Sequence, residues 1–296
     1  MPNTNTVRKR RPGDRTDGRL LRTVSPMSTV ALYIMKDRND ACNMFTDPVD
    51  IKEIEKYIAE KRKQGFKGLG MLHIIAAAYI RTVSKYPGIN RFVSGQRIYA
   101  RNDIQIMLTI KKTMEVHSPD TVIKAVFSPD ADIKTVYDEI NRQITDGKSG
   151  DDSSDFDRTA DFLRRLPRPI LRAVVKFLKF LDYFGWLPKF LLHVSPFHGS
   201  FFITSMGSLG IPPIYHHLYN FGNVPLFCSY GAKRTDYVNG PLGIPVEKKF
   251  VDCNYVMDER ICDGHYYATA FKYLREILRN PQVLDNPPDE VTEDID

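Results

Sequence analysis

The clearest alternation of apolar and polar positions lies near the C-terminal end of the chain. Residues 250–256 alternate as a half-buried strand does, and Asp263-Gly264 is a turn signal. Apolar residues then recur at helical spacing from Tyr266 to Leu278. We therefore predict a strand, a tight turn and a helix in this order, with the turn at a sheet edge where chemistry can be placed.

The rest of the chain alternates between short β-branched runs and longer helical patterns. In the first long pattern, Asp47 is read as the N-cap and Pro48 as the first helical residue. We expect the strands at 97–100 and 104–111 to form a hairpin or meander. The mixture predicts one well-buried domain with mixed α/β layering. Strands are predicted at 29–35, 97–100, 104–111, 122–127, 201–204 and 226–230, and helices at 47–64, 71–85 and 133–144.

Three segments depart from this pattern. Residues 146–157 are rich in Gly, Ser and Asp, which is typical of a mobile loop. Residues 162–194 interleave apolar and aromatic residues with lysine and arginine, and prolines divide them. We expect short amphipathic helices there that cover an apolar surface of the protein, with peripheral membrane contact as the alternative. The acidic tail, 287–296, is expected to be disordered.

Charge and cysteine content narrow the class of protein. Lysine and arginine outnumber aspartate and glutamate by 42 to 36, and much of the excess lies in residues 1–21. This basic segment is expected to be a solvated, flexible arm, so we infer no nucleic-acid binding from it. The four cysteines have no C-x-x-C spacing, so no metal site is expected. With no signal-peptide pattern, we expect a cytoplasmic protein.

The predicted turn carries a recognisable motif. Residues 259–264 read Glu-Arg-Ile-Cys-Asp-Gly, which resembles the HxxxDG motif of the chloramphenicol acetyltransferase-like superfamily, with Glu259 in place of the histidine. That superfamily includes the acyltransferase component of 2-oxoacid dehydrogenase complexes. FFITSMGSLG resembles the family's strand followed by glycines, with Thr204 and Gly207 at the matching places. LHIIAAAYIRTVSKYPGINRFV, VPLFCSYG and the Asn280-Pro281 pair follow the family order as well.

The resemblance implies an α/β mixed-sheet sandwich with flanking helices over residues 22–286. It also implies a homotrimer whose active sites lie at subunit boundaries, with coenzyme A or an acyl-CoA as substrate and a small or carrier-bound acyl acceptor. In such a site Glu259 would be the base, Asp263 would hold the turn through an ion pair, and Thr204 would stabilise the oxyanion. Gly264 and Gly207 would form the turns.

Two departures from the family pattern shape the hypotheses. The segment from about 146 to 200 has no counterpart in that pattern, and the chain enters the fold without a lipoyl or subunit-binding domain. We therefore expect that it does not act alone as a complete complex core. The histidine is missing, and a glutamate is a weak base for a thiol unless burial raises its pKa.

Both an enzyme and an inactive scaffold are therefore open. In the first, Glu259 or a displaced histidine is the base of an acyl transfer. In the second, the protein keeps the trimer and a coenzyme A site without turnover, and Glu259 pairs with a nearby arginine such as Arg260. Cys262 is expected to be a small packed residue. The substitute histidines are His198, His216, His217 and His265.

Overall fold

The computed structural model describes residues 9–111, 120–149, 163–240 and 244–296. A mixed six-stranded sheet has the strand order β2-β9-β8-β7-β5-β6. Its parallel pairs are β5–β7 and β7–β8, and the others are antiparallel. A smaller antiparallel sheet has the order β1-β4-β3. The strands are β1 Gly18–Leu20, β2 Cys42–Asp50, β3 Arg91–Ser94, β4 Arg97–Arg101, β5 Ile104–Lys111, β6 Asp120–Phe127, β7 Phe201–Ser205, β8 Leu226–Asn239 and β9 Pro245–Asp258.

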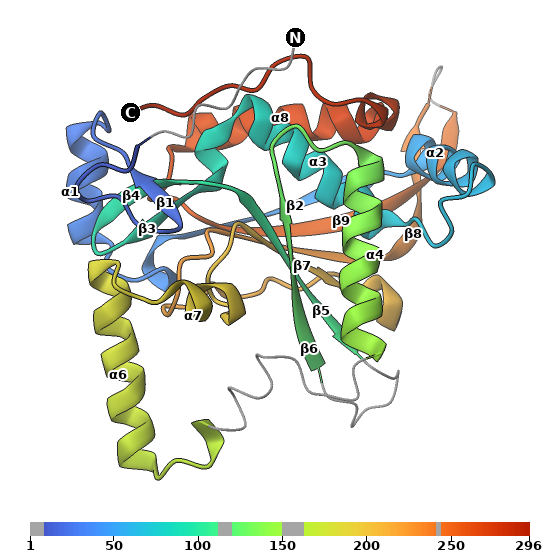
Figure 1. Cartoon of the computed structure of the whole chain (residues 1–296). Coiled ribbons are helices and arrows are strands. Elements are labelled where there is room, and N and C mark those ends of the chain that lie inside the picture. The colour runs from blue at the N-terminus through green and yellow to red at the C-terminus, as the bar shows by residue number, and fades with distance from the viewer. Residues whose placement is uncertain (1–8, 112–119, 150–162, 241–243) are drawn as a thin grey trace.

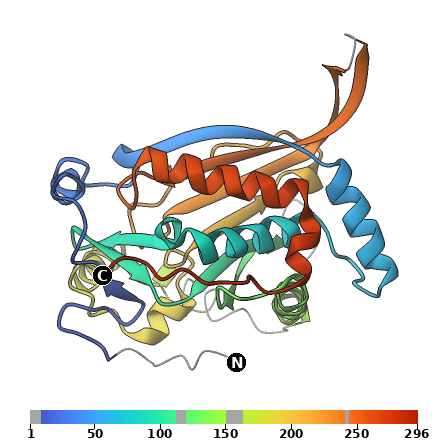
Figure 2. The ribbon, with the colours of Figure 1, turned by 90° about the horizontal axis from the view of Figure 1, so that it is seen from above.

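Four helices lie on one face of the large sheet (Figure 1). They are α2 Lys52–Lys63, α3 Met71–Lys85, α4 Ile133–Ser149 and α8 Gly264–Arg279. Figure 2 shows α3 and α8 side by side across the sheet, where they contact each other. The buried side chains between helices and sheet form the main core, so the predicted α/β sandwich with flanking helices is confirmed. Within the described part of the chain, no helix is long and apolar enough to cross a bilayer.

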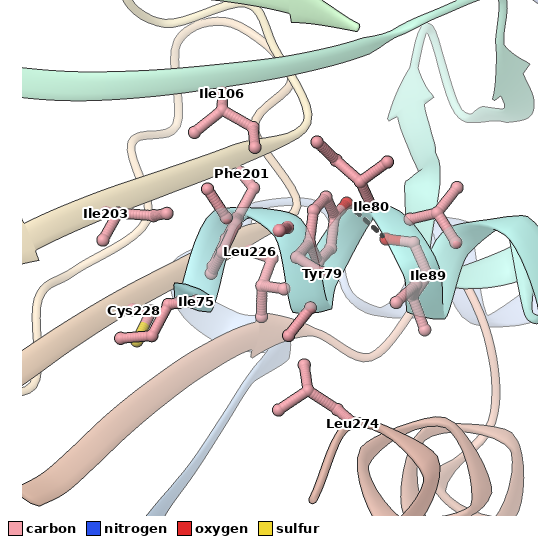
Figure 3. Close-up of a cluster of buried hydrophobic side chains, with 14 of the residues drawn as sticks. Ile75, Tyr79, Ile80, Ile89, Ile106, Phe201, Ile203, Leu226, Cys228 and Leu274 are labelled. Carbon is pink, nitrogen blue, oxygen red and sulfur yellow. Dashed lines mark hydrogen bonds between the residues drawn. The ribbon is translucent and has the colours of Figure 1, made fainter. Parts of the chain in front are cut away.

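Helix α3 lies at the centre of this core, and nearly every one of its side chains is buried. The Tyr79 ring packs 4.3 Å from that of Phe201 on β7, measured between centroids. Figure 3 shows Ile80 and Ile89 beside Tyr79, and Leu226 of β8 beneath it. Burying a tyrosine or phenylalanine ring in this way stabilises a fold by about 1.5–3 kcal/mol each.

The opposite face of the sheet has a smaller core and a polar border. Phe202, Phe227 and Val256 point to this side and are covered by Leu218 and Val224. The chain between β7 and β8 therefore lies over the sheet here. The outer surface of this segment exposes apolar side chains to solvent, namely Leu209, Ile211, Ile214, Tyr215 and Tyr219.

The predicted strand at 29–35 is wrong, and so is the start of the predicted helix at 47–64, whose later part is α2. Residues 29–34 belong to helix α1, Pro26–Ile34, because Ser25 caps it by accepting a hydrogen bond from Ser28 N, and Pro26 begins it. Residues 47–50 belong to β2, so Asp47 is not a helix cap.

Tertiary contacts explain the β2 correction. The Asp47 carboxylate accepts a 2.6 Å hydrogen bond from Arg275 of α8. Pro48 is tolerated because β2 is an edge strand, where a missing N–H costs no ladder bond. The predicted hairpin of 97–100 and 104–111 is also wrong, since β4 and β5 belong to different sheets.

Both predicted flexible ends are ordered where the structure describes them. The tail crosses the surface beside the basic arm, and Arg11 lies 2.9 Å from the Asp296 carboxylate. Arg19 donates to the Ile295 carbonyl at 2.6 Å, and Arg91 Nε donates to Asp294 at 2.8 Å. Ion pairs of Arg11 and Arg19 with Asp296 therefore join the two segments, and Arg91 of β3 holds Asp294, which neither composition alone predicts. The predicted loop at 146–157 begins inside α4, and its residues from 150 lie outside the described chain.

The segment predicted at 162–194 to cover an apolar surface does so only in its last part, where Leu187 and Leu192 are buried. Helix α6, Arg168–Phe184, points away from the sheets, and the short α7, Lys189–Val194, returns to the body (Figure 1). The last turn of α6 is anchored by Asp182, whose carboxylate lies 2.8 Å from Arg15 and 3.4 Å from the His198 ring. Burial opposes the charge of Asp182, but His198 and Arg15 outweigh it and lower the pKa of this carboxyl to about 2.

We expect Asp182→Asn to destabilise the fold by about 2–3 kcal/mol at pH 7, because the folded carboxyl has a pKa of about 2 against about 3.9 in the unfolded chain. Because the folded pKa is lowered, the Asp182 carboxylate stabilises the fold above about pH 4, and this stabilisation is lost as the pH falls towards 2. At pH 3 the difference between wild type and variant should be roughly half of its value at pH 7.

Urea unfolding at pH 7, 5 and 3 measures this difference. The matched control is Asp138→Asn, which breaks an exposed pair with Lys134 and should cost under about 0.5 kcal/mol. A difference between wild type and Asp182→Asn that stays constant down to pH 3 would contradict the anchor.

Candidate functional site

The turn at 259–264 leaves the end of β9 and enters α8. The backbone N–H of Glu259 donates to the Ala41 carbonyl at 2.9 Å, which fixes the turn beside the start of β2. The Glu259 side chain is partly exposed and accepts a 2.6 Å hydrogen bond from the Asn43 amide. No described residue forms an ion pair with this carboxylate within 4.0 Å.

The predicted partner of Glu259 has a different role. Arg260 turns inward and forms two 2.7 Å hydrogen bonds with the buried Asp258 carboxylate. Arg38 lies 3.8 Å from the same carboxylate. Burial lowers the pKa of Arg38 to about 10 even though Asp258 opposes the shift. Two buried cations therefore share one buried anion directly behind the turn.

Asp263 and Gly264 differ from the roles that the resemblance implies. The Asp263 carboxylate caps α8 by accepting a 2.8 Å hydrogen bond from Tyr266 N, and the residue is exposed. No ion pair of Asp263 with another described residue lies within 4.0 Å. An added Cβ at Gly264 would meet no atom within 4 Å. Among the residues that the structure describes, nothing therefore requires glycine at this position.

Thr204 lies at the C-terminal end of β7 in a polar row across the second face of the sheet. It pairs with Ser229 of β8, which pairs with Asn254 of β9, which pairs with Thr46 of β2. Thr46 donates to the Asn254 amide oxygen at 2.6 Å. The end of β7, which carries the predicted oxyanion donor, thus lies in a row of hydroxyl and amide groups from neighbouring strands.

Gly207 is needed where β7 ends. An added Cβ would lie 2.6 Å from the Gly231 carbonyl oxygen of β8, closer than real Cβ atoms approach. The glycine therefore allows the chain after Thr204 to turn across the neighbouring strand, as the sequence predicts.

Thr204 and Glu259 are far apart within one chain. Two strand spacings separate β7 from β9, and Glu259 is five residues beyond Asn254, which lies in the Thr204 row. At about 3.3 Å per residue and 4.8 Å per strand, this separation is roughly 15–20 Å. One subunit alone does not bring the predicted base and the predicted oxyanion donor together.

The histidines named as possible substitute bases pack against other side chains or are exposed. His198 is buried against Asp182, and its Nδ1 lies 2.7 Å from the Ser195 hydroxyl. The His216 ring stacks on Phe227 at 4.0 Å, and burial lowers its pKa. His265 is exposed in the first turn of α8. Burial raises the pKa of the Cys262 thiol well above its usual range, which suits a packed residue.

A cavity of about 240 Å³ lies beside the buried arginines. Its charged lining is Lys36, Arg38, Lys179 and Arg260 against Asp37 and Asp182. Asp182 is paired with Arg15, and Arg38 and Arg260 are paired with Asp258, so Lys36 and Lys179 against Asp37 leave a small excess of positive charge. The cavity therefore suits an anionic group of a ligand.

Sequence reasoning missed Asn43 and Asp258. Asn43 was hidden because the strand that carries it was read as loop before a helix. Asp258 follows the alternating run of β9, and its spacing of two from Arg260 is an available signal for an ion pair. Among the described residues there is no group of three or more His, Cys, Asp or Glu side chains that could bind a metal.

No protein-family model matches this chain, and no curated protein matches it at a significant level. Solved structures do match. The Azotobacter vinelandii dihydrolipoamide acetyltransferase aligns with a TM-score of 0.56 and 13% identity over 96% of this chain and 98% of that one. The cubic core of a pyruvate dehydrogenase multienzyme complex aligns at 0.51 and 13% over 96% and 98%. A chloramphenicol acetyltransferase aligns at 0.51 and 13% over 88% and 99%.

These likenesses establish the fold. The chain has the fold of the 2-oxoacid dehydrogenase acyltransferase catalytic domains and of chloramphenicol acetyltransferase. The resemblance read from the sequence is therefore confirmed at the level of fold. At these identities the likeness carries neither substrate nor activity across to this chain.

We expect Asp263→Ala to destabilise the protein by about 1 kcal/mol, because it removes the N-cap of α8. Asp263→Asn keeps a capping oxygen and should stay within about 0.5 kcal/mol of wild type. Thermal unfolding of the two variants measures the difference. Equal losses in both variants would mean that the charge of Asp263, through an ion pair to another subunit, matters more than the cap.

Proposed function

We propose that this protein is a coenzyme A-dependent acyltransferase whose active site is shared between subunits of a homotrimer. Glu259 is the base and Thr204 of a neighbouring subunit is the oxyanion donor. The observation that carries the proposal is the position of Glu259: it occupies the histidine place of the HxxxDG turn, at the end of β9, and no described residue forms an ion pair with its carboxylate.

The reaction uses these groups in a simple order. Glu259 takes the proton of the acceptor's thiol, hydroxyl or amine as this group attacks the thioester carbonyl of an acyl-CoA. The Thr204 hydroxyl donates to the oxyanion that forms. The carbon–sulfur bond then breaks, and the coenzyme A thiolate receives the proton from Glu259. The acceptor carries the acyl group away.

Two further observations support this proposal. In the Azotobacter vinelandii enzyme, the residues investigated for roles in the mechanism are a serine, a histidine and an asparagine, the last two four residues apart. Glu259 and Asp263 have the same spacing here, and Thr204 is a hydroxyl residue like the serine. The cationic cavity beside Arg38 and Arg260 suits an anionic group, and the phosphates of coenzyme A are such groups.

The trimer is supported by the surfaces that one subunit leaves apolar. The segment between β7 and β8 exposes five large apolar side chains over the sheet face that ends in Thr204. On α1, Met27 and Ile34 are 75% and 74% exposed. Apolar surfaces of this extent are typical of protein contacts. A matched structure is the core of a multienzyme complex, which agrees with assembly.

We expect Glu259→Gln to lower acyl-CoA-dependent thiol release by about 10²–10⁴-fold, because the amide cannot take up the proton. The measurement is free thiol appearing from a panel of acyl-CoAs with thiol, hydroxyl and amine acceptors. Glu60→Gln on the exposed face of α2 is the matched control and should retain full activity.

The same assay distinguishes an inactive scaffold. If wild type releases no thiol but coenzyme A raises its melting temperature, the protein binds without turnover, and Glu259→His should then create activity. An active wild type that loses activity in Glu259→His has a glutamate base. If coenzyme A neither reacts nor protects, both functions are excluded.

We expect a particle of three 34.0 kDa chains in light scattering. The shared site makes a sharper test. Glu259→Gln and Thr204→Val trimers should each be inactive, whereas trimers assembled from an equal mixture should recover about a quarter of wild-type activity, since one boundary in four combines two intact partners. No recovery in mixed trimers would place the whole site within one subunit.

A further inference from the structure

Within the described part of the chain, helix α6 has little cover, and Asp182 is its buried residue. It is 17 residues long, and its most extensive contact with another element is with β3, near the anchored last turn. The rest of the helix extends from the body by about 1.5 Å per residue, or roughly 20–25 Å (Figure 1).

Charge is confined to one side of α6. At 100° per residue, its four cations fall within an arc of about 80°, and an apolar arc of about 180° lies opposite. Asp182 is the one acidic residue of the helix, and it is buried in the anchor. The cations are Arg168, Arg172, Lys176 and Lys179, and the apolar arc includes Ile170, Leu171, Val174, Phe177, Leu178, Phe180, Leu181 and Phe184.

Aromatic rings continue this apolar arc beyond the helix end. Phe177 and Phe180 are 60% and 50% exposed, and Trp186 and Phe190 are 63% and 61% exposed. The Phe184 ring stacks on Trp186 at 5.1 Å, and Phe180 contacts both. Aromatic side chains in solvent beside lysine and arginine are typical of helices that lie in a bilayer interface.

We propose that α6, with Trp186 and Phe190, binds the surface of an anionic lipid bilayer. The helix then lies in the interface plane, with its phenylalanines among the acyl chains and its lysines and arginines at the phosphate groups. This inference does not depend on the acyl-transfer function.

A second copy of the chain fits α6 less well. Two α6 helices packed through their apolar arcs about a twofold axis would leave both basic arcs facing solvent, with no acidic residue opposite them. The acidic tail of another copy offers little free charge, since Asp294 and Asp296 already pair with Arg91 and Arg11. An apolar arc of about half the circumference is also wider than the seam of a helix pair.

The single tryptophan of the chain, Trp186, reports insertion directly. The full-length protein is mixed with vesicles of phosphatidylcholine, alone or with phosphatidylglycerol. We expect a blue shift of Trp186 emission and co-sedimentation with the anionic vesicles. Binding should weaken with added salt because the lysines and arginines are screened.

Two pairs of substitutions distinguish binding through α6 from attraction through the net charge of the protein. Lys176→Glu with Lys179→Glu should weaken binding to anionic vesicles by about 30-fold or more. The pair Lys56→Glu with Lys63→Glu on α2 changes the net charge by the same amount and should leave binding to anionic vesicles unchanged. Phe177→Ser with Phe180→Ser should abolish the blue shift without lowering the melting temperature, because both rings are exposed.

Three outcomes overturn the proposal. One is the absence of a blue shift with anionic vesicles. Another is an equal loss of binding in the α2 pair, which would make the attraction a property of net charge. The third is a Trp186 that is already shielded in the free protein and becomes exposed on dilution of the oligomer, which would assign α6 to contacts between copies.

Discussion

The buried carboxylate of Asp258 determines how the parts of this molecule meet. A single anion at the end of β9 is shared by Arg260 and Arg38, and each arginine also binds carbonyls of other segments. Arg260 donates to Met35 and Lys36 after α1, and Arg38 donates to Val93 of β3 and to Tyr219. An unpaired buried charge is costly, so these contacts hold together or fail together. They place the 259–264 turn between the two sheets.

The alternating and helical patterns were sufficient where one element makes its own core contacts. The run at 250–256 and the apolar residues of α3 both predict elements that the structure contains. Prediction failed where distant residues decide the conformation. Asp47 and Pro48 form a good helix start by local criteria, but Arg275 and the neighbouring β9 hold them in an edge strand. The acidic tail has the composition of disorder and is ordered by arginines at the other end of the chain.

The candidate site follows the same division. The HxxxDG-like spacing and the glycine after β7 can be read from the residues, because each is a local backbone requirement. Asn43 beside Glu259, and the inward turn of Arg260 to Asp258, depend on the pairing of β2 with β9. The separation between Glu259 and Thr204 depends on strand order, which no local pattern contains. Within one chain, the two residues therefore do not form one site.

The single anchored end of α6 affects how tightly an assembly of these chains would hold a membrane. In a trimer, the threefold axis relates three copies of the helix, so all three can touch a flat bilayer only if it lies across that axis. After the first helix binds, the other two are presented at high effective concentration, and weak contacts multiply into strong attachment. Membrane residence would then depend steeply on subunit association, while the buried Asp182 anchor keeps the three helices aligned.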